Sequence, residues 1–424
     1  MIFVTLLSAT ATAQEVWTYA ECVGYAREHN ISLQKYRLGE QTAAYDIEAA
    51  KSQWQPTLDF ATSQDYTNTP WAATNKNAYS GSYALNAGWT MWDGGVRTNT
   101  IKRNEIAGKQ AQIATDDYLR TIETDILQVY LNILYAAETV EISASAADLS
   151  KAQAERGKAL MEMGKMSRVE YAQLNSQYEQ DCYNLVNARA SYDSRRMELK
   201  QLLELGLATG ITPAPVEWTA DQVMAELPDM EQTYTLARGL DLQIAGLELD
   251  KEASDLDVKI AGAGRSPKIS VNAGAGTGYH APGSAFGTGL KQGWNERIGL
   301  SLSIPILDQK KTSTAVAKAK VQQIEAGLDI DRREITLAQT VEKWYIDTRS
   351  AQARFRAARQ QLESATLTDE LTNERFQLGY IDPEELLTSH NALTEARHTL
   401  LQAKYMAILG QKMIEYYRTA SVTL

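Results

Sequence analysis

The sequence predicts a mainly helical fold with a smaller β part, in which one unit of helix, strand pair and long helical hairpin is written twice. Three observations predict this fold. Landmark residues recur at fixed offsets, short segments alternate between apolar and polar residues, and two very long runs lack proline. Each chain would supply four strands, too few to close into a barrel, so several copies are expected to complete one.

Composition narrows the class of protein. Hydrophobic residues make up 44% of the 424 residues and charged residues 22%. This composition is typical of neither a disordered chain nor a helical membrane protein. No apolar run after the first dozen residues approaches the ~18 residues of a transmembrane helix. If the chain crosses a membrane, it must do so as a closed β-barrel. The net charge of −11 and the lack of a basic block argue against nucleic acid as a partner.

The N-terminal residues have the pattern of a targeting signal. A short apolar run is followed by Ala11-Thr12-Ala13, an A-x-A cleavage site, so residues 1–13 are predicted to be a secretory signal peptide. A basic stretch before the apolar run is missing. An ordinary apolar N-terminal segment is the alternative.

Four landmarks establish the internal repeat. Ala26 and Ala237 are 211 residues apart, as are Pro56 and Pro267. Asp93 and Asp308 are 215 residues apart, as are Gly164 and Gly379. The difference of four residues falls between Pro56 and Asp93, so this interval is expected to contain a loop of variable length, since loops tolerate insertions.

The longest elements are helices. From about Arg97 to Glu162 and from about Lys311 to Gln377 the chain contains no proline, and each run of ~65 residues would span roughly 100 Å as a helix. Apolar residues recur at spacings of three and four, as in coiled-coil packing. Return helices are predicted at about Arg168–Leu205 and Glu384–Tyr417, with Asp382-Pro383 as N-cap and first helical residue.

Period-2 alternation predicts the strands. In the last strand the apolar residues are Ile298, Leu300, Leu302, Ile304 and Ile306, and a similar pattern recurs in the other strands. The opposite faces are rich in Ser, Gly and Asn, which suit contact with water. Aromatic residues flank the strands as in the girdles of transmembrane barrels, although a soluble β-sandwich would carry them too. The candidate membrane-interface aromatics are Tyr79, Trp89, Trp92 and Trp294.

These patterns divide the chain into segments. They are the signal peptide (1–13), a helical segment (14–55), strand pair 1 (56–93), long helical hairpin 1 (94–206), a linker (207–230), the helix of the second copy (231–266), strand pair 2 (267–308), long helical hairpin 2 (309–418) and a tail (419–424).

Other chemistry finds little support. Cys22 and Cys182 have no nearby cysteine partner, which gives neither a metal site nor a disulfide framework. The glycines of 274–278 lack the Lys-Ser/Thr of a phosphate loop. His390 and His398 lie on a helix without carboxylates at metal-ligand spacing, so surface histidines are expected. No nucleophile elbow is present. We therefore expect no enzyme, no cofactor and no bound metal.

At this point the chain resembles the outer membrane efflux protein family, the TolC-like exit ducts. The resemblance covers nearly all of the chain after the signal. It rests on Trp17–Cys22, Gln55-Pro56, Met91–Gly95, the Gly164 and Gly379 turns with the helix starts that follow them, and the small-residue texture from Ala392 to Ala403. Each motif is weak alone, but their order and spacing together are specific.

The resemblance implies a homotrimer. It implies a twelve-stranded transmembrane β-barrel in the outer membrane, in contact with its lipid and continuous with a long periplasmic α-helical barrel. The loops at 67–78 and 276–289 would face outside. The chain would be the exit duct of a tripartite efflux or type I secretion system. It would pass small molecules or polypeptides passively and dock a periplasmic adaptor and an inner-membrane pump of the RND or ABC type.

The resemblance also implies functional residues. The expected periplasmic tip, where the adaptor docks, comprises Gly164, Lys165, Met166, Ser167, Gly379, Tyr380, Ile381 and Asp382. Glu170 and Glu385 are candidates for an acidic pore constriction, and an ordinary role at a helix start is the alternative for both. Some family members close the tip with a Tyr and an Arg where this chain has Phe376 and Ile381, so that closing network is not expected here.

Two other functions remain as alternatives. A periplasmic coiled-coil adaptor or scaffold without a pore would need the strands to form a small sandwich, and an enzyme would need catalytic residues that the sequence does not display. The exported substrate and the identity of the partner proteins are not encoded in any motif.

Overall fold

The computed structural model describes residues 15–74, 77–207, 209–281 and 286–424. The signal peptide expected at 1–13 lies outside these residues. The chain divides into two compact units. The first unit combines the chain up to Lys35 with Thr115–Leu242 and Arg333–Leu424, and the second combines Tyr36–Ala114 with Gln243–Arg332. Each unit therefore takes segments from both copies of the repeat.

Helices dominate the described residues. The helices are α1 (Tyr19–His29), α2 (Ile31–Ser52), α3 (Val96–Glu162), α4 (Arg168–Leu202), α5 (Ala220–Val223), α6 (Met230–Leu240), α7 (Leu242–Gly262), α8 (Phe286–Gln292), α9 (Lys311–Gln377) and α10 (Pro383–Thr419), with a 3₁₀ turn η1 (Ala263–Arg265). Both α3 and α9 have 67 residues. The proline-free runs of the sequence therefore form unbroken helices.

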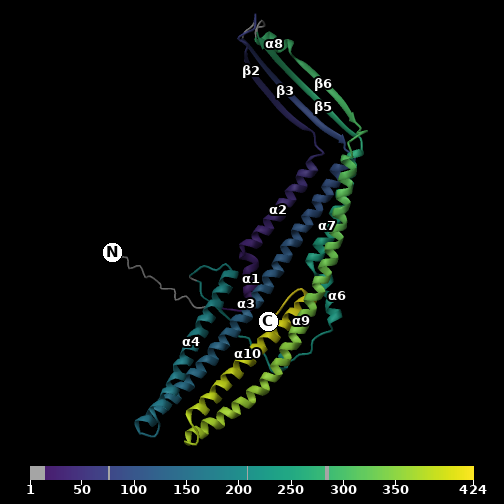
Figure 1. Cartoon of the computed structure of the whole chain (residues 1–424). Coiled ribbons are helices and arrows are strands. Elements are labelled where there is room, and N and C mark those ends of the chain that lie inside the picture. The colour runs from purple at the N-terminus through teal and green to yellow at the C-terminus, as the bar shows by residue number, and fades with distance from the viewer. Residues whose placement is uncertain (1–14, 75–76, 208, 282–285) are drawn as a thin grey trace, which may run out of the picture. The chain divides into compact units, whose positions relative to one another are not determined.

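The second unit contains an antiparallel sheet. Its strands are β2 (Thr57–Asn68), β3 (Asn77–Trp92), β5 (Lys268–Ala281) and β6 (Asn295–Ser303). In the described residues their order is β2-β3-β5-β6, as Figure 1 shows. The central pairing of β3 with β5 joins the hairpin of the first copy to that of the second. The two predicted strand pairs thus form one sheet, here named the β2–β6 sheet.

One strand is shorter than the sequence suggested. The prediction that Ile304 and Ile306 continue the last strand is wrong, because β6 ends at Ser303. Pro305 lacks a backbone N–H and cannot donate to a strand ladder. On the neighbouring strand β5, the first residue is Lys268, which pairs with Ser303 and directly follows Pro267. Prolines therefore stand just outside the paired part of both strands.

The length difference between the copies falls in the strand connections. Helix α8 lies between β5 and β6 in the second copy. In the first copy the described residues between β2 and β3 form only turns and bends. The predicted loop of variable length is therefore the connection between the two strands of each pair.

The strand-to-helix junctions repeat in geometry more than in sequence. Asp93 accepts hydrogen bonds from the backbone N–H of Gly95 and Arg97, and Asp308 accepts one from that of Thr312. Each carboxylate caps the start of a long helix. Gly94 and Gly95 have φ of 72° and 89°, and the equivalent Gln309 and Lys310 have φ of 52° and 64°. The second copy keeps the left-handed turn without glycine.

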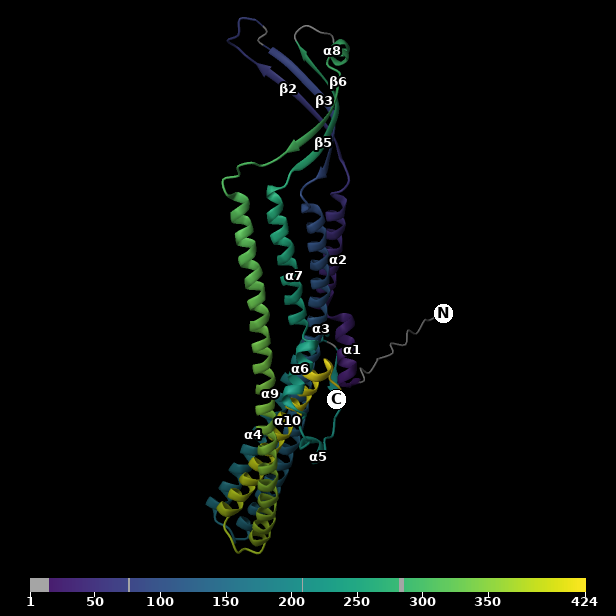
Figure 2. The same ribbon diagram turned by 90° about the vertical axis from the view of Figure 1, so that its right-hand side faces the viewer.

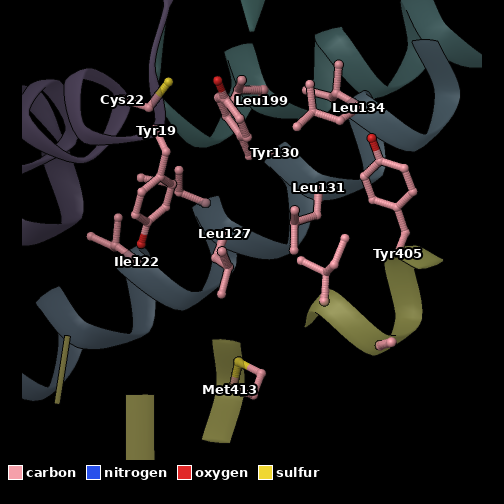
Figure 3. Close-up of a cluster of buried hydrophobic side chains, with 14 of the residues drawn as sticks. Tyr19, Cys22, Ile122, Leu127, Tyr130, Leu131, Leu134, Leu199, Tyr405 and Met413 are labelled. Carbon is pink, nitrogen blue, oxygen red and sulfur yellow. The ribbon is translucent and has the colours of Figure 1, made fainter. Parts of the chain in front are cut away.

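The hydrophobic core of the first unit lies where its helices meet. Side chains from α1, α3, α4 and α10 form one cluster, shown in Figure 3. Tyr130 is fully buried at its centre, and Cys22 of α1 is equally buried. Tyr19 packs edge-on against Tyr130 with ring centroids 6.2 Å apart.

A short strand pair that the sequence analysis did not predict closes this core. Strand β1 (Glu15–Trp17) pairs in parallel with β4 (Ile211–Pro213), which lies in the linker between the copies. The Tyr130 hydroxyl lies 3.1 Å from the carbonyl oxygen of Trp17 and 2.9 Å from that of Ala214. Tyr130 of α3 therefore connects the N-terminal strand and the linker to the core.

We predict that Tyr130→Phe destabilises the helical unit by about 0.5–1.5 kcal/mol, because the Trp17 and Ala214 carbonyl oxygens lose their contact with the hydroxyl, and only that of Trp17 keeps a hydrogen bond from the Ala214 N–H. Thermal or denaturant unfolding would measure the loss. Tyr183→Phe is the matched control, since Tyr183 is 62% exposed, and it should change stability by less than about 0.5 kcal/mol. Equal stability of the two variants would show that the Tyr130 hydroxyl does not hold the strand pair.

Candidate functional site

The β2–β6 sheet has one apolar and one polar face. The ladder places Leu58 in one row with Ala87, Ala273 and Ile298, and the next row holds Asp59, Asn86, Gly274 and Arg297. The apolar face carries Leu58, Phe60, Leu85, Trp89, Val271, Ile298, Leu300 and Leu302, and the polar face carries Asp59, Ser63, Asp65, Ser82, Asn86, Thr90, Ser270, Asn272, Arg297 and Ser301. The predicted alternation is present in all four strands.

The apolar face is open to its surroundings within one chain. Phe60 is 63% exposed, Ile298 82% and Leu300 72%. An exposed apolar surface that runs along several strands marks a site of contact with protein or lipid. The polar face is hollowed by a pocket near the helix starts, lined among others by Thr90, Ser270 and Asn272.

The four candidate interface aromatics flank the apolar face at its two ends. Tyr79 lies near the loop end of β3, and Trp294 immediately precedes β6 at the same end. Trp89 and Trp92 lie at the helix end of β3. Tyr79 and Trp89 are ten residues apart, roughly 33 Å along a strand, and a strand tilted by ~40° then covers about 25 Å. The role of these aromatic residues at a membrane interface stays a prediction.

The opposite end of the long helices turns at two equivalent sites, here named the tip turns (Gly164–Ser167 and Gly379–Asp382). In the first, the N–H of Lys165 donates to Leu160 and that of Gly164 to Met161. In the second, the N–H of Tyr380 donates to Arg375 and that of Gly379 to Phe376. Both are Schellman motifs, which require a left-handed residue after the helix. Glycine supplies it, with φ of 70° at Gly164 and 78° at Gly379.

Next, the return helices start with strong caps. Ser167 accepts from the N–H of Glu170, and the Glu170 carboxylate accepts from the N–H of Ser167 at 2.6 Å. Asp382 accepts from the N–H of Glu385 ahead of Pro383. The N-cap and proline predicted at the second turn are confirmed.

The predicted tip residues divide into an inner and an outer group. Met166 and Ile381 are partly buried and pack on an apolar cluster that joins the two hairpins. The other six are exposed: Gly164, Lys165, Ser167, Gly379, Tyr380 and Asp382. Both turns lie side by side in the helical unit (Figure 2). They therefore present one exposed surface made from both copies.

Phe376 lies in an apolar cluster just inside the tip turns. Phe376 is 6% exposed and belongs to a cluster with Ala154, Leu174 and Leu386. Together with Ile381 it links the two hairpins by apolar packing just inside the tip turns. The Arg156 guanidinium adds a hydrogen bond of 2.9 Å to the carbonyl oxygen of Gln377 across the same junction.

Glu170 and Glu385 both make local contacts. The backbone hydrogen bond from Ser167 holds the pKa of Glu170 below its ordinary value, against the opposing effect of the nearby Asp382 carboxylate. Glu385 forms an ion pair of 3.0 Å with Arg375 at the end of α9. These are contacts of helix starts, and the role of both side chains in a pore constriction stays a prediction.

A buried polar link joins the hairpins further from the tip. His390 Nε2 of α10 lies 3.4 Å from Asp181 Oδ2 of α4, and the two residues are 2% and 4% exposed. The expectation that His390 is a surface histidine is therefore wrong. The amides of Gln177 and Asn391 bond each other at 3.1 Å alongside.

The environment of Asp181 favours its charged form. Burial raises the pKa of this carboxyl, but the polar groups of His390, Ser150 and Gln177 around it together hold it below the ordinary value, and Gln177 donates a hydrogen bond of 3.1 Å to Asp181 Oδ1. The carboxylate is thus stabilised by groups from three helices, so it connects the two hairpins electrostatically as well as by packing.

Other kinds of site find no support. No group of three or more His, Cys, Asp or Glu side chains in the described parts of the chain is arranged to hold a metal ion. Among the described helices, none combines the length and the apolar character needed to cross a membrane.

Comparison with known proteins decides the family. The family described as outer membrane efflux protein matches this chain over residues 23–204 and again over 233–408. The chain belongs to the outer membrane efflux protein family. It is accordingly a transport protein of the outer membrane with its helical part on the periplasmic side. The two separate matches follow the internal repeat.

Curated relatives agree along most of the chain. Outer membrane efflux protein BepC of Brucella suis biovar 1 is 22% identical over 411 residues, 96% of this chain and 86% of that protein. Outer membrane protein TolC of Escherichia coli K12 is 20% identical over 96% of this chain and 83% of that protein. Alkaline protease secretion protein AprF of Pseudomonas aeruginosa is 22% identical over 69% of this chain and 60% of that protein.

Solved structures show the same fold. A crystal structure of CusC has a TM-score of 0.81 at 16% identity and covers 96% of this chain and 92% of its own. The outer membrane protein VceC of Vibrio cholerae has a TM-score of 0.76 at 15% identity and covers 93% of this chain and 95% of its own.

Sequence reasoning missed the residues that pair across the hairpins. Asp181 and His390 are 209 residues apart, and no local pattern marks either of them. Their contact depends on how α4 packs against α10. The apolar role of Phe376 was visible only as a departure from the family pattern.

We predict that Asp181→Asn weakens the acid sensitivity of the helical unit. Because the folded-state pKa of Asp181 lies below the unfolded one, its contribution is fully present above ~pH 4 and is lost as pH falls through the folded value. Wild-type protein should therefore lose more stability between about pH 5 and 3 than the variant. Thermal unfolding at several pH values measures this. The exposed Asp331→Asn should keep the wild-type slope, and an unchanged slope in Asp181→Asn would contradict the prediction.

Proposed function

We propose that this chain assembles as a homotrimer and forms the outer-membrane exit duct of a tripartite efflux or type I secretion system. Three copies of the β2–β6 sheet would give a twelve-stranded transmembrane barrel, and the long helices would continue it as a periplasmic helical barrel. Small molecules or polypeptides would pass through the bore without chemical change. The proposal includes no catalytic activity.

One observation carries this proposal. Within the described chain, β2 and β6 each have one edge without a partner strand, and all twelve residues of β2 and all nine of β6 are exposed. A free edge leaves backbone N–H and C=O groups unpaired, which is not tolerated in lipid. Neighbouring copies can pair both edges and close the sheet, with the apolar face toward lipid and the polar face toward water.

Helix α9 supports assembly as well. Val321, Ile324, Leu328 and Ile335 recur at spacings of three, four and seven residues, and each is more than half exposed. Residues at these spacings share one face of a helix. An apolar stripe of this kind needs a partner, and a helix of a neighbouring copy is the partner that closure of the sheet would bring near.

The tip turns are the proposed docking surface. Gly164, Lys165, Ser167, Gly379, Tyr380 and Asp382 would contact a periplasmic adaptor, which in turn would connect to an inner-membrane pump of the RND or ABC type. The apolar cluster around Phe376 and the Asp181–His390 link would hold the two hairpins together at the gate. Glu170 and Glu385 would face the narrowest part of the bore.

We predict that detergent-extracted protein has about three times the 47.0 kDa mass of one chain and forms ion-conducting pores in planar lipid bilayers. Light scattering combined with size exclusion measures the mass, and single-channel recording measures the pores. A monomer without conductance would contradict the proposal and favour a scaffold without a pore.

A second prediction concerns docking. Gly164→Trp should abolish export in cells while the oligomer persists, because no atom lies within 4 Å of the added Cβ and the side chain would project from the tip surface. The left-handed φ adds a cost of about 1–2 kcal/mol, too little to unfold the protein. Sensitivity of a complemented deletion strain to exported compounds is the measurement.

Gly239→Trp provides the control for that variant. Gly239 is an exposed glycine of α6 that also has no atom near its Cβ position. It should export normally. Normal export by Gly164→Trp would remove the tip turn from the docking surface.

A further inference from the structure

The two edge strands of the β2–β6 sheet carry opposite charges on the polar face. Asp59 and Asp65 are the charged residues of β2. On β6 the charged residues are Glu296 and Arg297. Since neighbouring residues of a strand point to opposite faces, Glu296 lies on the apolar face, where the Trp294 indole N–H bonds it at 3.1 Å. Arg297 is thus the charge of β6 on the polar face.

The placement of these charges follows from the register. Asp59 shares a row with Asn86, Gly274 and Arg297. A Cβ built on Gly274 would lie 3.4 Å from both Arg297 Nε and Asn86 Oδ1, so both of those side chains lie on the face of that Cβ. Ser63 and Ser82 bond each other at 2.8 Å on the same face. Asp65 lies two residues after Ser63 on β2, so its side chain points to the same face.

These three charges are available for an outside partner. Asp59, Asp65 and Arg297 are all exposed, and no ion pair within the described chain involves them. The outer edges of β2 and β6 also require a strand from another molecule. The partner that supplies a strand of matching length and opposite charge to each edge is a second copy of this chain.

We propose that Arg297 on β6 of one copy forms an ion pair with Asp59 or Asp65 on β2 of the next, and that this pair directs the edges to join head to tail. The inference rests on the proposed function. Two-fold pairing of β2 with β2 would oppose carboxylates, which destabilises a strand pair. Pairing of β6 with β2 brings opposite charges together and repeats around a closed ring.

The stagger of a closed barrel decides which carboxylate is reached. Strands in a barrel tilt, so a row of the ladder returns at a different height after passing around it. Arg297 of one copy therefore need not lie opposite Asp59 of the next copy, although the two residues share a row within one chain. Asp65 lies six residues further along the same strand and faces the same side, so the test changes both carboxylates together.

Charge reversal tests the pair. Arg297→Asp should lower the fraction of oligomer in denaturing detergent by about tenfold, as expected for the loss of a modest ion pair at each of several equivalent interfaces. The triple variant Arg297→Asp, Asp59→Arg, Asp65→Arg should restore most of that loss. Lys268→Asp reverses a charge on the inner strand β5 and should leave the oligomer unchanged. Gel electrophoresis without boiling measures the oligomer fraction.

A milder variant covers the case in which charge reversal prevents folding. Arg297→Gln should fold, and its oligomer stability should depend less on added salt than that of wild type, because salt screens the pair only where it exists. Equal salt dependence, or no rescue in the folded triple variant, would overturn the inference. A wild-type protein that forms no oligomer would instead overturn the proposed function.

Discussion

The structure depends on one constraint, which is that the backbone groups at both edges of the β2–β6 sheet need partners. The sheet also exposes an apolar face, with Ile298 at 82% and Leu300 at 72%. Unpaired edges are unfavourable in lipid and prone to pair with other chains in water, and the apolar face is unfavourable in water. Assembly of several copies would satisfy both features. The exposed apolar stripe on α9 and membership of the outer membrane efflux protein family are consistent with such an assembly.

Duplication supplies the geometry of the chain without fixing its residues. At the strand-to-helix junctions, Gly94-Gly95 and Gln309-Lys310 adopt the same left-handed backbone. Asp93 and Asp308 both cap the helix that follows. The tip turns keep glycine in both copies. The contacts that close each helix have thus been retained, while the surrounding side chains have diverged into different local chemistry.

The two hairpins are held together in two distinct ways. Close to the tip, Phe376 and Ile381 contribute to an apolar cluster. Further away, Asp181 and His390 form a buried polar contact. Apolar packing depends little on pH, whereas the carboxylate contributes only while it is charged. The two contacts therefore respond differently to acid, although they join the same helices.

The sequence by itself determined the repeat, the extents of α3 and α9, the cap at Asp382 and the alternating faces of the strands, because these follow from local periodicity and backbone preference. The domain-like segments, the candidate tip residues and the interface aromatics were placed by spacing and resemblance. Only the tertiary structure decided that β1 pairs with β4, that His390 is buried against Asp181, and that Asp59 and Arg297 share a row. Those contacts join residues far apart in the chain, so their formation depends on packing and register, which local patterns do not specify.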